Sequence, residues 1–232
     1  MPYTDIFIDL DDTIYDTRNN AQLALKELFE HFHFERYYAS IDDFITPYWE
    51  ANTELWAQYA RGEIGRDYLI LERFRRPLSH AQGLNADDAF ALEVNAYFLQ
   101  RSSEKTGIVE GAHELLGYLQ HKYKLHLASN GLHEVQHNKL KSAKLDKYFT
   151  SVILSEDAGA NKPQREFFEY ALRTTNCKRE NAIMIGDNFN TDIIGAKNAG
   201  IDQIYFKRDA SLPTPEPVTY EVLSLKEIID FL

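Results

Sequence analysis

The sequence has little cysteine and no long hydrophobic run. Its single cysteine, Cys177, excludes a disulfide within the chain. No apolar stretch approaches the ~20 residues that a membrane-spanning helix needs, so we expect no membrane partner. The opening residues, MPYTDIFIDLDD, lack the basic start and apolar core of a signal peptide. These absences predict a reducing, cytoplasmic location.

Basic charge is also scarce. The 232 residues include 25 Lys and Arg against 36 Asp and Glu, which gives a net charge of −11. Such a chain has no basic field with which to hold a nucleic-acid backbone. We therefore expect no nucleic-acid polymer as a partner. The length allows one domain, or one domain with an insertion, and leaves the oligomeric state open.

Short apolar runs typical of strands occur at the N-terminus and through the C-terminal half, and helical patterns separate the later ones. The predicted strands are YTDIFIDL, KLHLAS, SVILS, AIMIG and QIYF, and the predicted helices EGAHELLGYLQHKY, HEVQHNKLKSAKL, QREFFEYALRTTN and TDIIGAKNAG. Strands that alternate with helices predict an α/β fold, a doubly wound (Rossmann-like) parallel sheet with helices on both faces. Ligands of such sheets bind outside the carboxyl ends of the strands.

Residues 16–104 have a different character, with few strand signals and long aromatic-rich helical stretches. We predict an all-helical insertion there, between the first and second strands, so that residues 1–15 and 105–232 form the core. Ser40 and Asp43 predict a capping box at the start of one helix. After Lys207, three prolines favour an extended loop before a closing helix at about 224–231.

Three aspartates crowd the end of the first strand in IFIDLDDT, residues 6–13. Like charges at this spacing repel and must lose hydration, which is unfavourable unless something positive binds there. Side chains two apart on a strand point the same way, so Asp9 and Asp11 should flank one spot. Asp187 follows another apolar strand, and Asp192 comes shortly after it. Carboxylates that converge from parallel strands favour Mg²⁺ over zinc.

Two further segments add groups suited to phosphate. The run KLHLASNG supplies the Ser129 hydroxyl, Asn130 and backbone N–H donors at a third strand end. The run GANKP supplies Lys162, a point charge able to balance both phosphate and carboxylates. Residue types and spacing alone thus predict a Mg²⁺-assisted phosphate site.

Four motifs in order, D-L-D-D-T, S-N-G, N-K-P and G-D-N-F-N-T-D, resemble those of the haloacid dehalogenase superfamily, a group dominated by aspartate-nucleophile phosphatases. The helical insertion resembles the type 1 cap of that family. The stretches FIDLDDTIYDT, NGxxxVQxxKL and GDNFNTD are similar to the pyrimidine 5′-nucleotidase-like branch. The resemblance implies a nucleoside 5′-monophosphate as substrate, with a sugar phosphate as the alternative. It also implies a cap that closes over the site and selects the substrate.

The resemblance implies a role for each motif residue. Asp9 would attack phosphorus and form an aspartyl-phosphate, and Asp11 would protonate the leaving alcohol and then activate water. For this division of labour we expect metal contact to keep Asp9 ionised, and a like charge beside Asp11 to raise the pKa of Asp11. The remaining implied roles are phosphoryl binding by Ser129, Asn130 and Lys162, Mg²⁺ ligation by Asp9, Asp187 and the Asp11 carbonyl, ligation or orientation by Asp192, and support of the turn by Thr13. Asp12, where many relatives have glycine, receives no catalytic role.

One motif favours a different class of enzyme. HEVQH, residues 133–137, matches the H-E-x-x-H of zinc metallopeptidases, with His133 and His137 as ligands, Glu134 as the base and Glu156 as a possible third ligand. We consider this the less favoured hypothesis, because Lys139, Lys141 and Lys144 place much of that helix in solvent. A dehalogenase would also use Asp9, but a halide leaves without a proton, so Asp11 favours phosphate esters.

Overall fold

The computed structural model describes residues 3–211 and 213–232. The chain divides into two compact units. The first, which we call the core unit, joins the residues up to Thr17 with those from Thr106 onward. The second, the helical unit, runs from Arg18 to Lys105. Our predicted insertion spanned residues 16–104.

The core unit is built on a six-stranded sheet in the order β3-β2-β1-β4-β5-β6, in which every pair of neighbours is parallel. The strands are β1 (Asp5–Ile8), β2 (Lys124–Ser129), β3 (Ser151–Leu154), β4 (Ala182–Gly186), β5 (Asp202–Phe206) and β6 (Tyr220–Val222). Asp5 of β1 is in register with Lys124 of β2 and Ala182 of β4. The carboxyl ends of β2, β1 and β4 therefore lie side by side.

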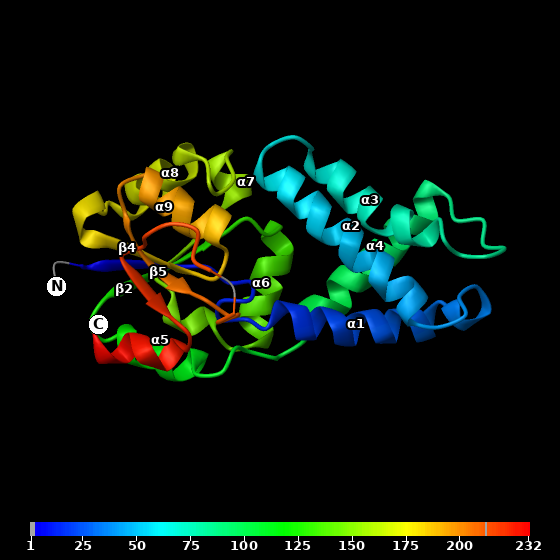
Figure 1. Ribbon diagram of the computed structural model, residues 1–232, viewed down its shortest axis with the longest axis horizontal. Helices are drawn as coiled ribbons and strands as arrows, with labels where there is room; N and C mark the ends of the chain where they lie inside the picture. Colours follow the sequence, from blue (N-terminus) through cyan, green and yellow to red (C-terminus); the bar gives the residue numbers. More distant parts are fainter. Residues whose placement is uncertain (1–2, 212) are drawn as a thin grey trace. The chain divides into compact units, whose positions relative to one another are not determined.

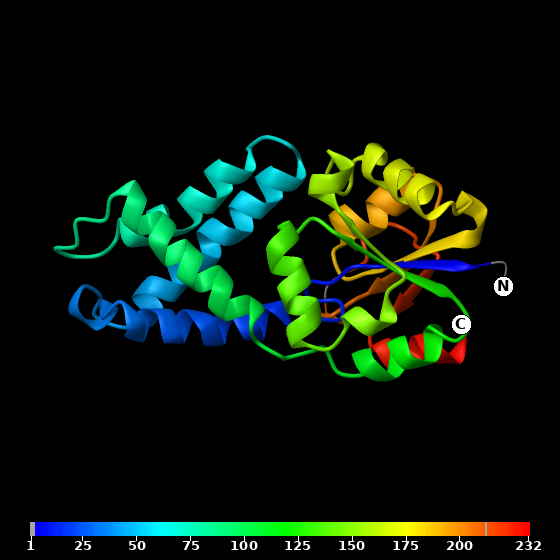
Figure 2. The ribbon, with the colours of Figure 1, turned by 180° about the vertical axis from the view of Figure 1, so that it is seen from behind.

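Helices cover both faces of this sheet (Figures 1 and 2). Ile6 and Ile8 share one buried cluster with side chains of α5 (Ala112–Leu119), α6 (His133–Ser142) and the 3₁₀ segment η5 (Leu225–Asp230). Phe7, which points the other way, belongs to a second cluster with α8 (Arg165–Thr175) and α9 (Ile194–Asn198). Because successive strand residues point to opposite faces, burial of both sets explains the nearly continuous apolar runs.

The predicted α/β fold is confirmed, with differences in detail. The shorter segments of the core unit are η2 (Asp146–Tyr148), α7 (Ser155–Ala158), η3 (Arg179–Asn181) and a π-helical turn, η4 (Phe189–Ile193). The predicted helix at 191–200 is therefore split between η4 and α9. Strand β6 lies within the tail that we predicted to be an extended loop, and η5 replaces the closing helix.

The helical unit contains α1 (Thr17–His31), η1 (Phe34–Arg36), α2 (Asp42–Ala60), α3 (Arg66–Leu78) and α4 (Asp88–Ser103). α3 packs against both α2 and α4. Aromatic rings fill the interior, among them Phe34, Phe44 and Phe74, which are fully buried. Ser40 and Asp43 exchange backbone-to-side-chain hydrogen bonds of 2.9 and 3.3 Å, which confirms the capping box.

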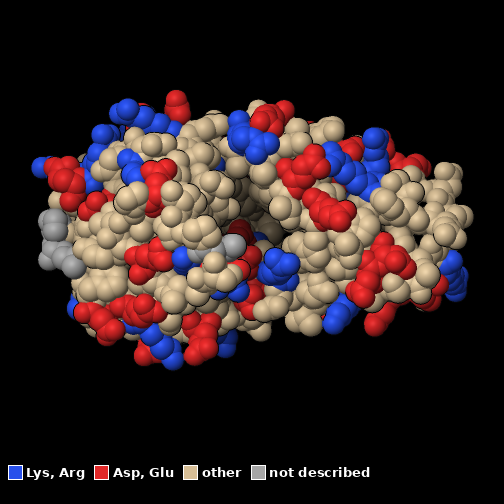
Figure 3. Space-filling view, in the orientation of Figure 1, with Lys and Arg blue, Asp and Glu red and all other residues tan. Residues whose placement is uncertain are grey.

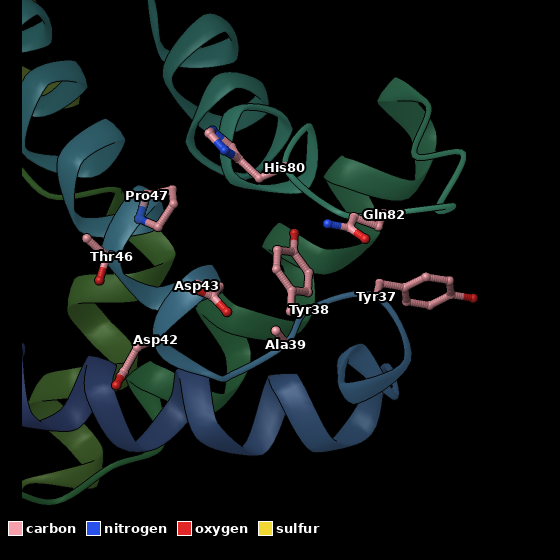
Figure 4. A pocket seen from close by; sticks show the side chains of 9 residues that line it. All are labelled: Tyr37, Tyr38, Ala39, Asp42, Asp43, Thr46, Pro47, His80 and Gln82. Carbon is pink, nitrogen blue, oxygen red and sulfur yellow. The ribbon is translucent and has the colours of Figure 1, made fainter.

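The helical unit also contains a cavity of about 560 Å³ beside the start of α2 (Figure 4). Its described lining is Tyr37, Tyr38, Ala39, Asp42, Asp43, Thr46, Pro47, His80 and Gln82. The Tyr38 hydroxyl donates 2.9 Å to the Pro77 carbonyl and is thereby held within the unit. None of the residues predicted for the phosphate site is among this lining.

The surface shown in Figure 3 carries acidic and basic side chains interspersed with one another. Of the helices in the described part of the chain, none combines the length and apolar character needed to cross a membrane.

Candidate active site

The predicted site residues come from three neighbouring strand ends and one loop. Asp9 follows β1, Ser129 ends β2 and Asp187 follows β4. Lys162 lies in the loop between α7 and α8. The parallel order of the sheet brings these segments, which are far apart in sequence, to one edge of the core unit.

Lys162 is the central cation of the site. Its Nζ donates to Asp9 Oδ1 and the Ala128 carbonyl, each at 2.6 Å, and lies 2.7 Å from Asp192 Oδ1. The three N–H bonds of the ammonium group are thus all engaged. Burial opposes the charged form, but the Asp192 and Asp9 charges outweigh it, so the pKa of Lys162 is raised. Lys162 is therefore a fixed positive charge.

Asp9, Asp187 and Asp192 form a carboxylate cluster around this lysine, with one oxygen of each lying within 4.8 Å of the others. Burial and the neighbouring carboxylates raise the pKa of Asp9 well above its usual range, although Lys162 acts in the opposite direction. Burial, with the Asp192 charge, raises the pKa of Asp187 to about 7. If all three carboxylates are ionised, the one ammonium leaves two negative charges in excess, and the raised pKa values of Asp9 and Asp187 show that this state needs a further cation. An all-oxygen donor set with that excess fits a divalent cation such as Mg²⁺.

Short-range contacts hold the cluster in place. The Thr13 hydroxyl donates 2.9 Å to Asp187 Oδ1 and accepts 3.0 Å from the Asp187 backbone N–H. The Asn188 backbone N–H donates 3.1 Å to Asp192 Oδ2. A Cβ on Gly186 would lie 2.3 Å from that same oxygen, so only glycine fits beside Asp192. The motif G-D-N-F-N-T-D thus positions two carboxylates at once.

The Asp11 carboxylate does not join the cluster, contrary to our expectation that Asp9 and Asp11 flank one spot. Strand β1 ends at Ile8, and the chain then turns, so the strand alternation no longer applies. Asp11 Oδ1 accepts hydrogen bonds from Lys139 and Thr17, the latter at 2.6 Å, and Oδ2 accepts one from Gln136 at 2.6 Å.

The expectation that the pKa of Asp11 is raised is also wrong. Burial does act to raise it, but the Lys139 charge and the hydrogen bonds from Lys139, Thr17 and Gln136 outweigh burial, so the pKa of Asp11 is lowered. Lys139, which we placed on a solvated face, is in fact buried, whereas Lys141 and Lys144 are exposed. The neighbouring carboxylate is apparent from the sequence, but the contact between Asp11 and the Lys139 ammonium is not.

The S-N-G motif follows β2 directly. Ser129 is buried, and its Oγ accepts from the Gly131 backbone N–H at 3.0 Å and from Gln136 Nε2 at 2.6 Å. The Asn130 side chain binds the backbone of Lys162, accepting from its N–H at 2.8 Å and donating to its carbonyl at 2.9 Å. Asn130 therefore fixes the loop that carries Lys162.

Asp12 lies in the left-handed region, with φ 61°. Asparagine, aspartate and glycine tolerate this conformation best, so an aspartate is compatible with this turn. Arg208 Nη1 lies 2.8 Å from Asp12 Oδ1 and donates 3.2 Å to its carbonyl. The Asp12 carboxylate is thus held by Arg208, apart from the three-carboxylate cluster.

Among the described residues, His133 and His137 have no third side chain placed to share a metal ion with them. The His133 and His137 rings lie 4.6 Å apart between centroids, but Glu156 accepts a hydrogen bond from the His133 backbone N–H. Within residues 3–211 and 213–232, one group of three His, Cys, Asp or Glu side chains is placed to share a metal ion, and it consists of Asp9, Asp187 and Asp192.

Comparison with known proteins identifies the family of the chain. A family model described as haloacid dehalogenase-like hydrolase matches residues 6–206. The chain belongs to this family. As a haloacid dehalogenase-like hydrolase it is an enzyme, and the metallopeptidase hypothesis is set aside.

Relatives of this hydrolase cover nearly its whole length. It is 31% identical to the putative HAD-hydrolase YfnB of Bacillus subtilis, over 99% of this chain and 95% of YfnB. It is also 31% identical to the pyrimidine 5′-nucleotidase PynA of Streptococcus pneumoniae, over 100% and 96% of the two chains. The same identity relates it to a glyceraldehyde 3-phosphate phosphatase of Pyrococcus furiosus, over 98% and 92%. A crystal structure of YfnB bound to magnesium superposes with a TM-score of 0.88 and 29% identity, covering 98% of this chain and 97% of that one.

Sequence reasoning missed four residues that contact the predicted ones. They are Thr17, Gln136, Lys139 and Arg208. A signal for two of them was present, since Gln136 and Lys139 are the Q and K of the stretch NGxxxVQxxKL, to which no role was assigned. Arg208 had none, because its partner lies at the other end of the chain.

Proposed function

We propose that this hydrolase is a Mg²⁺-dependent phosphomonoesterase that acts through an aspartyl-phosphate on Asp9. The observation that supports this most is the buried cluster itself: a carboxylate at a strand end, joined to Lys162 and surrounded by two more carboxylates. A charge excess of this kind suits a site that gathers a divalent cation and a phosphoryl group. It would be costly as a purely structural feature.

In this proposal an Asp9 oxygen attacks phosphorus, and the bond from phosphorus to the ester oxygen breaks as the leaving alcohol departs. Water then attacks the phosphorus of the aspartyl-phosphate, which regenerates the Asp9 carboxylate and releases inorganic phosphate. The Ser129 hydroxyl binds a phosphoryl oxygen with the proton that it has to donate, and the Lys162 ammonium, whose N–H bonds engage Asp9, Ala128 and Asp192, contributes to phosphoryl binding by balancing the negative charge. Asn130 contributes by fixing the Lys162 loop.

Asp11 is assigned both proton transfers. With its lowered pKa it is ionised before substrate binds, which suits the later step, in which it takes a proton from the attacking water. The earlier step requires Asp11 to hold a proton for the leaving alkoxide. A phosphate group bound nearby brings negative charge, which raises the pKa of Asp11 and opposes the effect of Lys139.

The metal belongs to the same proposal. Asp9 and Asp187, with the Asp11 carbonyl, would hold Mg²⁺, and Asp192 would ligate it or orient the other ligands. Bound there, Mg²⁺ would neutralise charge on the phosphoryl oxygens. Thr13 supports this set through its two hydrogen bonds with Asp187.

For the substrate we infer a nucleoside 5′-monophosphate, since PynA is named a pyrimidine 5′-nucleotidase and aligns over the whole chain. A sugar or triose phosphate is the second candidate, supported by the glyceraldehyde 3-phosphate phosphatase relative at equal identity. Because the core residues named here suit the phosphoryl group alone, the proposal assigns selection of the leaving group to the helical unit.

A panel of phosphate esters tests the proposal. The purified protein should release phosphate from nucleoside monophosphates in the presence of Mg²⁺ and lose this activity with a chelator. Asp9→Asn should abolish turnover while the protein stays folded. Asp12→Asn is the matched control and should keep activity within about threefold, because asparagine tolerates the same backbone conformation. Full turnover by Asp9→Asn would contradict the nucleophile, and activity indifferent to chelation would contradict the metal.

A further inference from the structure

Gln136 contacts two of the proposed site residues with a single nitrogen. Its Nε2 lies 2.6 Å from Asp11 Oδ2 and 2.6 Å from Ser129 Oγ. An amide nitrogen has two N–H bonds, so it can serve both partners at once. Gln136 is fully buried in α6, and its position is therefore fixed by packing.

The amide is confined on its other side by Gly131. A Cβ at Gly131 would lie 2.1 Å from Gln136 Nε2 and 2.3 Å from its Cδ. The third residue of the S-N-G motif is thus glycine because the Gln136 side chain occupies that space. The nitrogen of the amide therefore faces both Asp11 Oδ2 and Ser129 Oγ.

This arrangement determines what the Ser129 hydroxyl can do. A serine hydroxyl has one donor and two acceptor positions. Both acceptor positions are taken, one by the Gly131 N–H at 3.0 Å and the other by Gln136. Within the described part of the chain no acceptor takes the Ser129 proton, although Ser129 is buried. The hydroxyl is therefore available only as a donor.

We propose that Gln136 is a positioning residue that makes Ser129 a donor to the phosphoryl group and holds the Asp11 carboxylate in its working orientation. The inference rests on the proposed phosphatase function. It predicts that loss of the Gln136 amide weakens two separate steps. Phosphate binding depends on the Ser129 proton, and expulsion of the alcohol depends on Asp11.

The test compares Gln136→Met, which keeps the volume and removes both donors, with the same substitution at the exposed Gln120. For each protein, kcat and KM are measured with p-nitrophenyl phosphate and with the alkyl phosphate ester that the wild type hydrolyses fastest. The inhibition constant of inorganic phosphate is measured as well. For Gln136→Met we expect the phosphate inhibition constant to rise about tenfold, and kcat for the alkyl ester to fall about ten- to a hundredfold. The aryl ester should lose less, because its leaving group needs no proton. Gln120→Met should match the wild type.

A double-mutant cycle isolates the route through Ser129. If Gln136 acts on phosphate through that hydroxyl, Gln136→Met should no longer change the phosphate inhibition constant in a Ser129→Ala background. Gln136→Glu is the second variant, should Gln136→Met fail to fold. The Glu carboxylate would accept the Ser129 proton, whereas the Gln136 amide donates to Ser129. The inhibition constant of phosphate should therefore rise at least as much as in Gln136→Met.

Two results would overturn the inference and leave the phosphatase function intact. One is a folded variant with an unchanged inhibition constant and an unchanged ratio of alkyl to aryl rates. The other is an equal loss on both esters with unchanged phosphate inhibition, which is the pattern of a merely structural residue. A wild-type protein that hydrolyses no phosphate ester would overturn the proposed function, and the inference with it.

Discussion

Lys162 and Asp9 form a buried ion pair, with 2.6 Å between Nζ and Oδ1. The two residues come from segments far apart in sequence, and the same ammonium group also lies 2.7 Å from Asp192. One cation thus stabilises two carboxylates that burial alone would disfavour.

The first prediction concerns this pair. Lys162→Met should lower the free energy of unfolding by about 3–5 kcal/mol without Mg²⁺, since it leaves buried carboxylates without their cation. Added Mg²⁺ should restore part of the loss by supplying positive charge. Urea unfolding with and without MgCl₂ measures both effects. Lys141→Met, at an exposed position of α6, is the control, and equal stability of the two variants would contradict the central role of Lys162.

The second prediction concerns the metal. Mg²⁺ at about a hundred times its dissociation constant should stabilise the wild type by about 2.7 kcal/mol, because it binds the folded state alone. Asp187→Asn should remove most of this effect, whereas the exposed Asp230→Asn should keep it. The readout is the shift of Tm in a Mg²⁺ titration. A shift that survives in Asp187→Asn would place the binding of Mg²⁺ elsewhere.

The third prediction uses two glycines with opposite surroundings. Gly186→Ala places a Cβ 2.3 Å from Asp192 Oδ2, so it should displace that carboxylate and reduce phosphatase activity at least about tenfold. At Gly117, in α5, an added Cβ meets nothing within 4 Å. Gly117→Ala should therefore keep full activity and stabilise the protein by up to about 1 kcal/mol. Steady-state kinetics and urea unfolding separate the two, and normal activity of Gly186→Ala would contradict the close approach.

The fourth prediction is a pH dependence of stability that arises away from the site. His126 Nε2 lies 2.8 Å from Asp5 Oδ1, both residues are buried, and His126 Nδ1 has no hydrogen-bond partner among the residues that the structure describes. Burial lowers the pKa of His126 although Asp5 acts to raise it. Burial tends to raise the pKa of Asp5, but hydrogen bonds from Thr4 and His126 outweigh it, so that pKa is lowered as well.

The sign follows from the lowered pKa of His126. Below a pH of about 6.5, the ordinary pKa of histidine, His126 takes up a proton in the unfolded chain but stays neutral in the folded protein. The free energy of unfolding should thus fall by up to about 2 kcal/mol from pH 7 to pH 5. His126→Gln should flatten this dependence, and the exposed His121→Gln should not. Urea unfolding at several pH values is the measurement, and parallel curves for wild type and His126→Gln would count against it.

Sequence alone was sufficient for five of the six strands described in the sheet and for most of the helices that cover it. The strands read as nearly continuous apolar runs because helices cover both faces of the parallel sheet. The alternation of these runs with helical patterns was therefore enough to predict the fold. The short strand β6 was missed because a three-residue strand after three prolines gives no periodic signal. The division of the helix at 191–200 was missed for a different reason, since the π-helical turn η4 has no local sequence signature.

The sequence predicted that carboxylates from separate strands lie close together, but not which side chains each of them contacts. Asp9, Asp187 and Asp192 do lie together, as residues at neighbouring strand ends should. Asp11 does not, because the direction of its side chain depends on where β1 stops and on Lys139 and Gln136 from α6. Contacts of this kind depend on packing between segments distant in the chain, and a single sequence carries no local record of them.

The central position of β1 has a consequence for synthesis of the chain. β1 is translated before the other strands, yet its two hydrogen-bonding neighbours are β2 and β4, which follow only after the whole helical unit. The nascent apolar strand thus has two open edges while residues 18–105 are translated, and such edges are prone to aggregation. During translation, pairing of β1 within the sheet has to wait until β2 and β4 have emerged, whereas every residue of the helical unit is available before either of them.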